Sequence, residues 1–115
     1  MKNKTTRSNG NGYSPRPVQL DYAHPTATAV YLAGTFNDWR PEDTPMIASG
    51  AGRWTKTLTL PPGVYEYLII SDYEWITDPR ARESVPNPFG GRNSVLRVKA
   101  GHRRVAGPVV ARNQP

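Results

Sequence analysis

Short runs in which apolar and polar residues alternate extend along most of the middle of the chain, and residues such as Gly, Pro, Asn, Asp and Ser separate them. A period of two places successive side chains on opposite faces and is typical of a strand with one face buried. The runs predict β-strands over residues 18–22, 26–34, 53–60, 64–71, 74–77 and 93–98.

The third and fourth of these runs give the strongest strand predictions. In the third, Trp54, Leu58 and Leu60 share one face, and threonines occupy the other. The fourth is rich in aromatic and β-branched side chains, which favour strands. A Pro-Pro-Gly turn at 61–63 joins the two runs. The sequence SDYEW that ends the fourth run predicts a tight hairpin turn into a short strand.

The pattern predicts an all-β protein. No stretch of ten residues has helical periodicity, and the 115 residues include 12 Pro and 10 Gly, which punctuate turns. Six or seven short strands favour an immunoglobulin-like β-sandwich, with one domain over residues 17–99. Residues 1–16 and 100–115 show no strand pattern, and we expect them to form a disordered N-terminal tail and a flexible C-terminal tail.

The net charge of +6 raises the question of nucleic-acid binding. Residues 18–98 contain seven basic and nine acidic residues, so the expected domain is slightly acidic and the excess positive charge lies in the tails. A folded basic groove is therefore not predicted. The tails alone could attract phosphates or acidic surfaces weakly.

Several kinds of chemistry are not supported by the sequence. The chain has no cysteine, so disulfides and thiolate chemistry are excluded. His24 and His102 have no Asp, Glu or Cys partner at metal-ligand spacing, so neither a metal nor a cofactor is expected. Glu66, Asp72 and Glu74 are carboxylates of the kind that glycosidases use in pairs, but a sandwich of this size has little room for a cleft. We therefore expect no enzyme activity.

The N-terminus is positively charged, but no apolar segment of the kind found in a secretory signal follows it. No apolar run approaches the roughly 20 residues of a membrane span. The expected location is the cytoplasm, without contact with a membrane.

The tryptophans fall into two settings. Trp54 lies on the apolar face of a strand, where core packing accounts for it. Trp39 has polar neighbours in a predicted loop, and Trp75 directly follows a turn. Either ring could cap an end of the sandwich, but two rings in similar polar settings favour binding. A flat ring suits a sugar, a nucleobase or a proline, and the acidic middle of the chain favours polysaccharide over nucleic acid.

Three segments, VYLAGTFNDW, RWTKTLTLPPGVYEYLIISDYEWITDP and VPNPFGGRNSVLRV, occur in that order over about residues 18–98. Together they resemble carbohydrate-binding module family 48, which includes the glycogen-binding domain of the AMP-activated protein kinase beta subunit. The resemblance implies an early-set, immunoglobulin-like sandwich. It also implies a non-catalytic module that binds α-1,4-glucans such as glycogen and starch.

The resemblance also assigns roles to individual residues. Trp39 ends the F-N-x-W motif and Trp75 follows the turn, and both are expected to stack on glucose. Asn93, just before the last strand, is expected to hydrogen-bond sugar hydroxyls. Phe89, in the preceding loop, is expected to insert against the oligosaccharide.

Two positions depart from the family pattern. Leu68 stands where the family often has a lysine or arginine that reaches sugar hydroxyls, and the loss of such a donor costs about 1–3 kcal/mol. Tyr73 stands where glycine is common in the turn, so it requires a left-handed backbone or a different turn, and it could add a third aromatic ring.

These departures leave an alternative function open, namely a protein-interaction or scaffolding domain on the same fold. Leu68, Ile70 and the two tryptophans would then form an apolar docking patch. An enzyme of glycogen metabolism is one partner that would fit either function. Weak attachment to RNA or another acidic surface through the basic tails is a third hypothesis.

Overall fold

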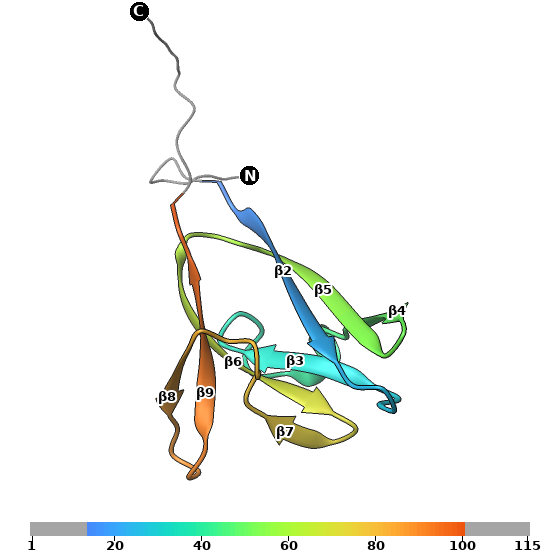
Figure 1. The fold of residues 1–115 in the computed structure, drawn as a ribbon. Helices are drawn as coiled ribbons and strands as arrows, with labels where there is room; N and C mark the ends of the chain where they lie inside the picture. Colours follow the sequence, from blue (N-terminus) through green and yellow to red (C-terminus); the bar gives the residue numbers. More distant parts are fainter. Residues whose placement is uncertain (1–13, 101–115) are drawn as a thin grey trace, which may run out of the picture.

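The computed structural model describes residues 14–100, and these residues form two antiparallel β-sheets that pack as a sandwich (Figure 1). The strands are β2 (Arg16–Ala23), β3 (Val30–Gly34), β4 (Ile47–Gly50), β5 (Arg53–Leu60), β6 (Gly63–Ser71), β7 (Glu74–Ile76), β8 (Glu83–Pro86) and β9 (Arg92–Val98). A single 3₁₀ turn, η1 (Pro41–Asp43), is the helical element of residues 14–100. The predicted all-β sandwich is confirmed.

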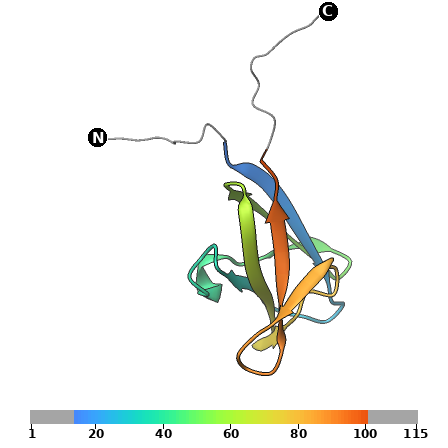
Figure 2. The same cartoon turned by 90° about the vertical axis from the view of Figure 1, so that its left-hand side faces the viewer.

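Strand β6 is the centre of the larger sheet. β3 pairs with residues 67–71 along one edge of β6. Along the other edge, β9 pairs with residues 63–67 and β7 with residues 69–71, and β8 extends the sheet beyond β9. Figure 2 shows β6 and β9 running side by side. The smaller sheet has the order β2-β5-β4.

The core lies between the sheets and follows the alternation of the strands. Its buried members are Tyr22, Val30, Leu32, Met46, Leu58, Leu60, Tyr67, Ile69 and Val98. Burial of each aliphatic side chain of this kind contributes about 1.5–3 kcal/mol. Trp54 packs against the cluster, as predicted. Because Tyr67 and Ile69 of β6 point into the core, Leu68 projects from the outer face of the sheet.

One polar cluster is buried beside this core. The hydroxyl of Tyr67 donates to Oδ2 of Asp78, and the backbone N–H of Asp78 donates to Oγ of Ser94. Burial raises the pKa of Tyr67, and the hydrogen bond to the Asp78 carboxyl group adds to the shift. The cluster ties the segment after β7 to β6 and β9.

The predicted strand over residues 26–34 is too long, because β3 begins only at Val30. The carboxylate of Asp72 accounts for the difference. Its Oδ1 accepts hydrogen bonds from the backbone N–H and the hydroxyl of Thr28 and from the N–H of Ala29, each at 2.9 Å. These bonds draw the residues before β3 into a loop.

Strands β4 and β8 are not predicted by the hydrophobic pattern. Every residue of β4 is exposed, so no apolar face marks it. β8 has four residues and ends in proline. Neither strand shows the alternation that predicts β5 or the run of aromatic and β-branched residues that predicts β6.

The predictions for the two tails, including His102, fall mostly on residues 1–13 and 101–115, which lie outside the described part of the chain. Within residues 14–100, no helix has the length and apolar character needed to cross a membrane.

Candidate functional site

An open hollow of about 460 Å³ lies where β6, β7 and the loop between β8 and β9 meet. We call it the Trp75 hollow. It is lined by Leu68, Trp75, Thr77, Asn87, Phe89, Gly91 and Arg92. The structure thus brings together three of the six predicted site residues, Leu68, Trp75 and Phe89. The other three, Trp39, Tyr73 and Asn93, do not line it.

Strand pairing places Trp75 on the outer face of the sheet. Trp75 pairs with Ile70 of β6, and Ile70 in turn pairs with Tyr31 of β3. The next residue of β7, Ile76, packs against the core. Trp75 therefore points outward, and 49% of it is exposed. Ile70 is only 5% exposed, so it cannot contribute to the docking patch considered from the sequence.

The loop between β8 and β9 is organised by Asn87. Its Oδ1 accepts hydrogen bonds from the backbone N–H of Phe89 at 2.9 Å and of Gly91 at 3.1 Å. Gly90 has φ 88°, a conformation that favours glycine. The backbone of Phe89 is therefore held in place while its side chain is 93% exposed. Asn87 is not among the site residues predicted from the sequence, although an Asn followed by Pro-Phe-Gly-Gly is a turn signal.

Asn93 lies below the surface rather than on it. It is 8% exposed, and its Oδ1 accepts a hydrogen bond from Nδ2 of Asn87 at 3.1 Å. Its own Nδ2 donates to Oε1 of Glu66 at 3.0 Å. Asn93 thus connects the Phe89 loop to β6. Its direct contact with a sugar stays a prediction.

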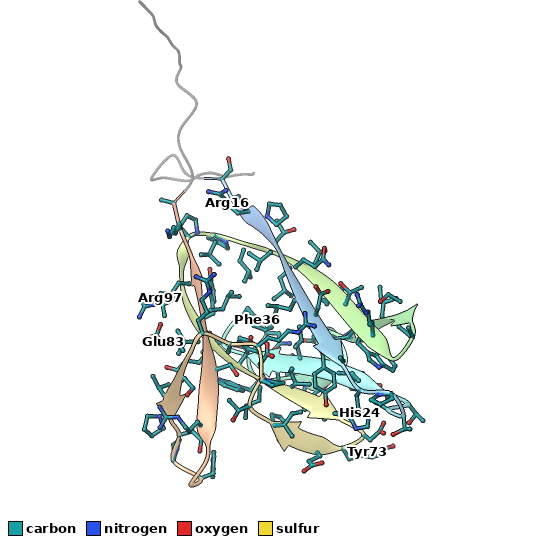
Figure 3. All side chains as sticks on the ribbon, in the orientation of Figure 1. Arg16, His24, Phe36, Tyr73, Glu83 and Arg97 are labelled. Atoms are coloured by element: carbon teal, nitrogen blue, oxygen red, sulfur yellow. The ribbon has the colours of Figure 1, made fainter. Side chains whose placement is uncertain are left out.

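The turn between β6 and β7 consists of Asp72 and Tyr73, which have φ 48° and φ 74°. Of the two conformations expected for Tyr73, the structure adopts the left-handed one. The three hydrogen bonds to Oδ1 of Asp72 fix this turn against the segment before β3. They also hold the pKa of Asp72 below its ordinary value, with the Ala29 N–H making the largest contribution. Tyr73 is 96% exposed at the tip of the turn (Figure 3).

Trp39 is placed by the loop that follows β3. Its backbone N–H donates to the carbonyl oxygen of Gly34 at 2.9 Å, and its φ is 59°. Its side chain is half-buried. Since β3 and β7 pair with opposite edges of β6, Trp39 and Trp75 are attached to opposite edges of this strand.

Arg92 is the charged residue among those that line the Trp75 hollow. Its Nε donates to Oγ of Ser84 at 2.7 Å, and its Nη2 donates to the carbonyl oxygen of Ser84 at 2.9 Å. Arg92 is not among the site residues predicted from the sequence. Since Arg92 and Ser94 lie on the same side of β9 and Ser84 pairs with Ser94, the guanidinium lies on the side of β9 opposite to Asn93. These contacts depend on β8, which the sequence does not predict.

Comparison with known proteins places this architecture in a family. A family model described as the glycogen recognition site of AMP-activated protein kinase matches residues 16–104. The chain belongs to this family. The resemblance drawn from the three sequence motifs is therefore confirmed, and the membership supports a carbohydrate-binding role.

One relative and one solved structure show how the similarity of this chain is distributed. The 5'-AMP-activated protein kinase subunit beta-1 of Sus scrofa is 33% identical over 70 residues, which cover 61% of this chain and 54% of the relative. The chain thus spans about half the length of that curated relative. The crystal structure of maltogenic amylase from S. marinus has a TM-score of 0.61 at 22% identity, covering 77% of this chain and 15% of that chain. At this identity the likeness concerns the fold.

Proposed function

We propose that this member of the glycogen-recognition family is a non-catalytic module that binds α-1,4-glucan chains such as glycogen and starch. The observation that carries the proposal is the half-exposed Trp75, which shares a hollow with Leu68 and Phe89. An indole face is flat and apolar, and so is the C–H face of a glucose ring, so the two surfaces stack. We expect Trp75 to contribute most to binding.

Trp39 is proposed as a second ring that only a longer chain reaches. β3 and β7 are two strand spacings apart across β6, or about 10 Å. A glucan of several units that crosses β6 would contact both tryptophans. Affinity should therefore rise with chain length and then level off. Because few side chains are engaged, we expect dissociation constants between about 1 μM and 1 mM.

The proposal is tested by titrating the full chain with maltose to maltoheptaose, with calorimetry and tryptophan emission as readouts. Trp75→Ala should weaken maltoheptaose binding by about tenfold or more, equivalent to about 1.4 kcal/mol. Ile47→Ala is the matched control, because Ile47 is 62% exposed but lies on β4 of the other sheet. Cello-oligosaccharides of equal length test the selectivity for α-1,4 linkages.

Unchanged emission and no heat with any maltooligosaccharide would contradict the proposed function, as would wild-type affinity in Trp75→Ala. The near-complete exposure of Tyr73 and Phe89 favours protein docking as the second candidate. A chain that binds no glucan but forms a stable complex with an enzyme of glycogen metabolism would support docking instead.

A further inference from the structure

The loop that carries Phe89 is connected to β6 by a continuous chain of side-chain hydrogen bonds. The backbone N–H of Phe89 donates to Oδ1 of Asn87 at 2.9 Å, and Nδ2 of Asn87 donates to Oδ1 of Asn93 at 3.1 Å. Nδ2 of Asn93 then donates to Oε1 of Glu66 at 3.0 Å. Building on the proposed function, we propose that Glu66 is a positioning residue of the glucan site. Through the two asparagines, its carboxylate holds the loop where the Phe89 ring meets the glucan.

Strand geometry places this chain of hydrogen bonds on the outer face of the larger sheet. Tyr67 of β6 points into the core, so its neighbours Glu66 and Leu68 both project outward. The hydrogen bond to Glu66 brings the Asn93 amide to the same face. Asn87 lines the Trp75 hollow together with Leu68. The chain therefore begins in the lining of the hollow and ends two residues from Leu68 on β6.

Both ends of the chain require the same orientation of the two amides. A carboxylate only accepts hydrogen bonds, so Asn93 turns its NH₂ group toward Glu66 and its oxygen toward Asn87. A backbone N–H only donates, so Asn87 turns its oxygen toward Phe89 and its NH₂ group toward Asn93. The two requirements agree, so an acceptor at position 66 stabilises the loop as observed. Without that acceptor, the NH₂ group of Asn93, which is only 8% exposed, would lose its partner.

The Phe89 loop depends on such a hold because its aromatic ring does not anchor it. The side chain of Phe89 is 93% exposed, so packing of the ring cannot fix its position. The loop is held instead by its backbone, since Oδ1 of Asn87 accepts from the N–H groups of both Phe89 and Gly91. A loop that is already ordered loses less conformational entropy when a ligand binds. Glu66 therefore raises the affinity for glucan by ordering the Phe89 loop in advance.

The test compares the maltoheptaose affinities of Glu66→Met and Glu66→Gln. Methionine has a similar length but no carboxylate acceptor, and we expect it to weaken binding about fivefold. Glutamine keeps an acceptor oxygen for Asn93 and should retain the wild-type affinity. Glu83→Met is the matched control, because its carboxylate joins β8 to β9 through Arg97 and has no hydrogen bond to the Phe89 loop (Figure 3). This variant should bind maltoheptaose as the wild type does.

Two further measurements separate positioning from a purely structural effect. In the Phe89→Ala background, which should itself bind more weakly, Glu66→Met should cause no further loss, because Phe89 is the side chain through which Glu66 acts. Hydrogen exchange followed by NMR should show the Phe89 N–H protected in the wild type and in Glu66→Gln. The same N–H should exchange faster in Glu66→Met.

Several results would overturn the role of Glu66. Wild-type affinity in Glu66→Met together with a loss in Trp75→Ala would do so and would leave the proposed function standing. Equal losses in Glu66→Met and Glu66→Gln, wild-type affinity in Phe89→Ala, or a full further loss from Glu66→Met in that background would overturn it too. Rapid exchange of the Phe89 N–H in the wild type would overturn it even if Glu66→Met failed to fold. A wild-type chain that binds no maltooligosaccharide would overturn both proposals.

Discussion

Two connections place the tryptophans at opposite edges of β6, and they use the same backbone conformation. The β3 connection comprises residues 35–40. Within it, Asp38 has φ 56° and Trp39 has φ 59°. In the β7 turn, Asp72 and Tyr73 have φ 48° and 74°. Residues other than glycine rarely adopt such values, and each costs about 1–2 kcal/mol. Both connections must therefore be held by other contacts.

The contacts that hold them differ in charge and in burial. In the β3 connection, the amide of Asn37 accepts from Gly34 N–H at 3.0 Å and donates to the carbonyl oxygen of Leu32 at 3.0 Å and to Oγ1 of Thr44 at 2.9 Å. These bonds are partly buried. In the β7 turn, the exposed carboxylate of Asp72 accepts hydrogen bonds from the backbone N–H groups of Thr28 and Ala29. One connection is thus fixed by a neutral group that does not titrate, and the other by a charged group that does.

The difference bears on how each ring is presented. Trp39 has the left-handed backbone itself, so the position of its ring depends directly on Asn37. Trp75 follows the β7 turn and lies on a regular strand opposite Ile70. We therefore expect Trp39 to be displaced when its connection is disturbed, and Trp75 to keep its place when the turn is disturbed.

The largest expected effect follows from Asn37→Ala. The change removes three partly buried hydrogen bonds and leaves the buried carbonyl oxygen of Leu32 and the hydroxyl of Thr44 unsatisfied. Unfolding in urea should show a loss of about 3 kcal/mol in the free energy of unfolding. Thr35→Ala, which removes one acceptor 3.2 Å from the Glu66 N–H in the same connection, is the control and should cost about 1 kcal/mol or less. Equal losses in the two variants would contradict the special role of Asn37.

A smaller, pH-dependent effect is expected from Asp72→Asn. The pKa of Asp72 is held below its ordinary value of 3.8, first by the Ala29 N–H and then by Thr28. A lowered carboxyl pKa stabilises the folded chain above the ordinary value, and this stabilisation is lost as the pH falls through the folded-state pKa. Asparagine keeps the acceptor but does not titrate. The urea midpoint of the wild type should therefore fall more between pH 7 and pH 3 than that of Asp72→Asn.

A neighbouring carboxylate provides the control for this prediction. Glu74 accepts no side-chain hydrogen bond from residues 14–100. Glu74→Gln should keep the acid dependence of the wild type. If Asp72→Asn and Glu74→Gln showed the same acid dependence, the carboxylate of Asp72 would not be the titrating support of the β7 turn.

The sequence predicts the parts of the fold and of the site that a local pattern marks, and it does not predict those that depend on contacts between distant residues. The alternation of 53–60 predicts β5 with its observed bounds, and the burial of residues 57–60 follows a period of two. The start of β3 depends on a carboxylate more than forty residues away, Asp72, which no local pattern reveals. Leu68, Trp75 and Phe89 are predicted from motif positions and meet in one hollow. Arg92 is not predicted, because its hydrogen bonds to Ser84 depend on β8, a strand without a hydrophobic pattern.

The smallest effect, of opposite sign, is expected from Tyr73→Gly. Glycine adopts φ 74° without strain, and the ring is 96% exposed, so little packing is lost. The greater freedom of glycine in the unfolded chain offsets part of the gain, which leaves a stabilisation of up to about 1 kcal/mol. The urea midpoint should rise slightly, whereas Trp39→Gly should lower it, because the indole in the β3 connection is half-buried. A lower midpoint for Tyr73→Gly would mean that the tyrosine ring makes contacts that outweigh the strain. Weaker maltoheptaose binding by the same variant would then identify Tyr73 as the third aromatic ring of the site.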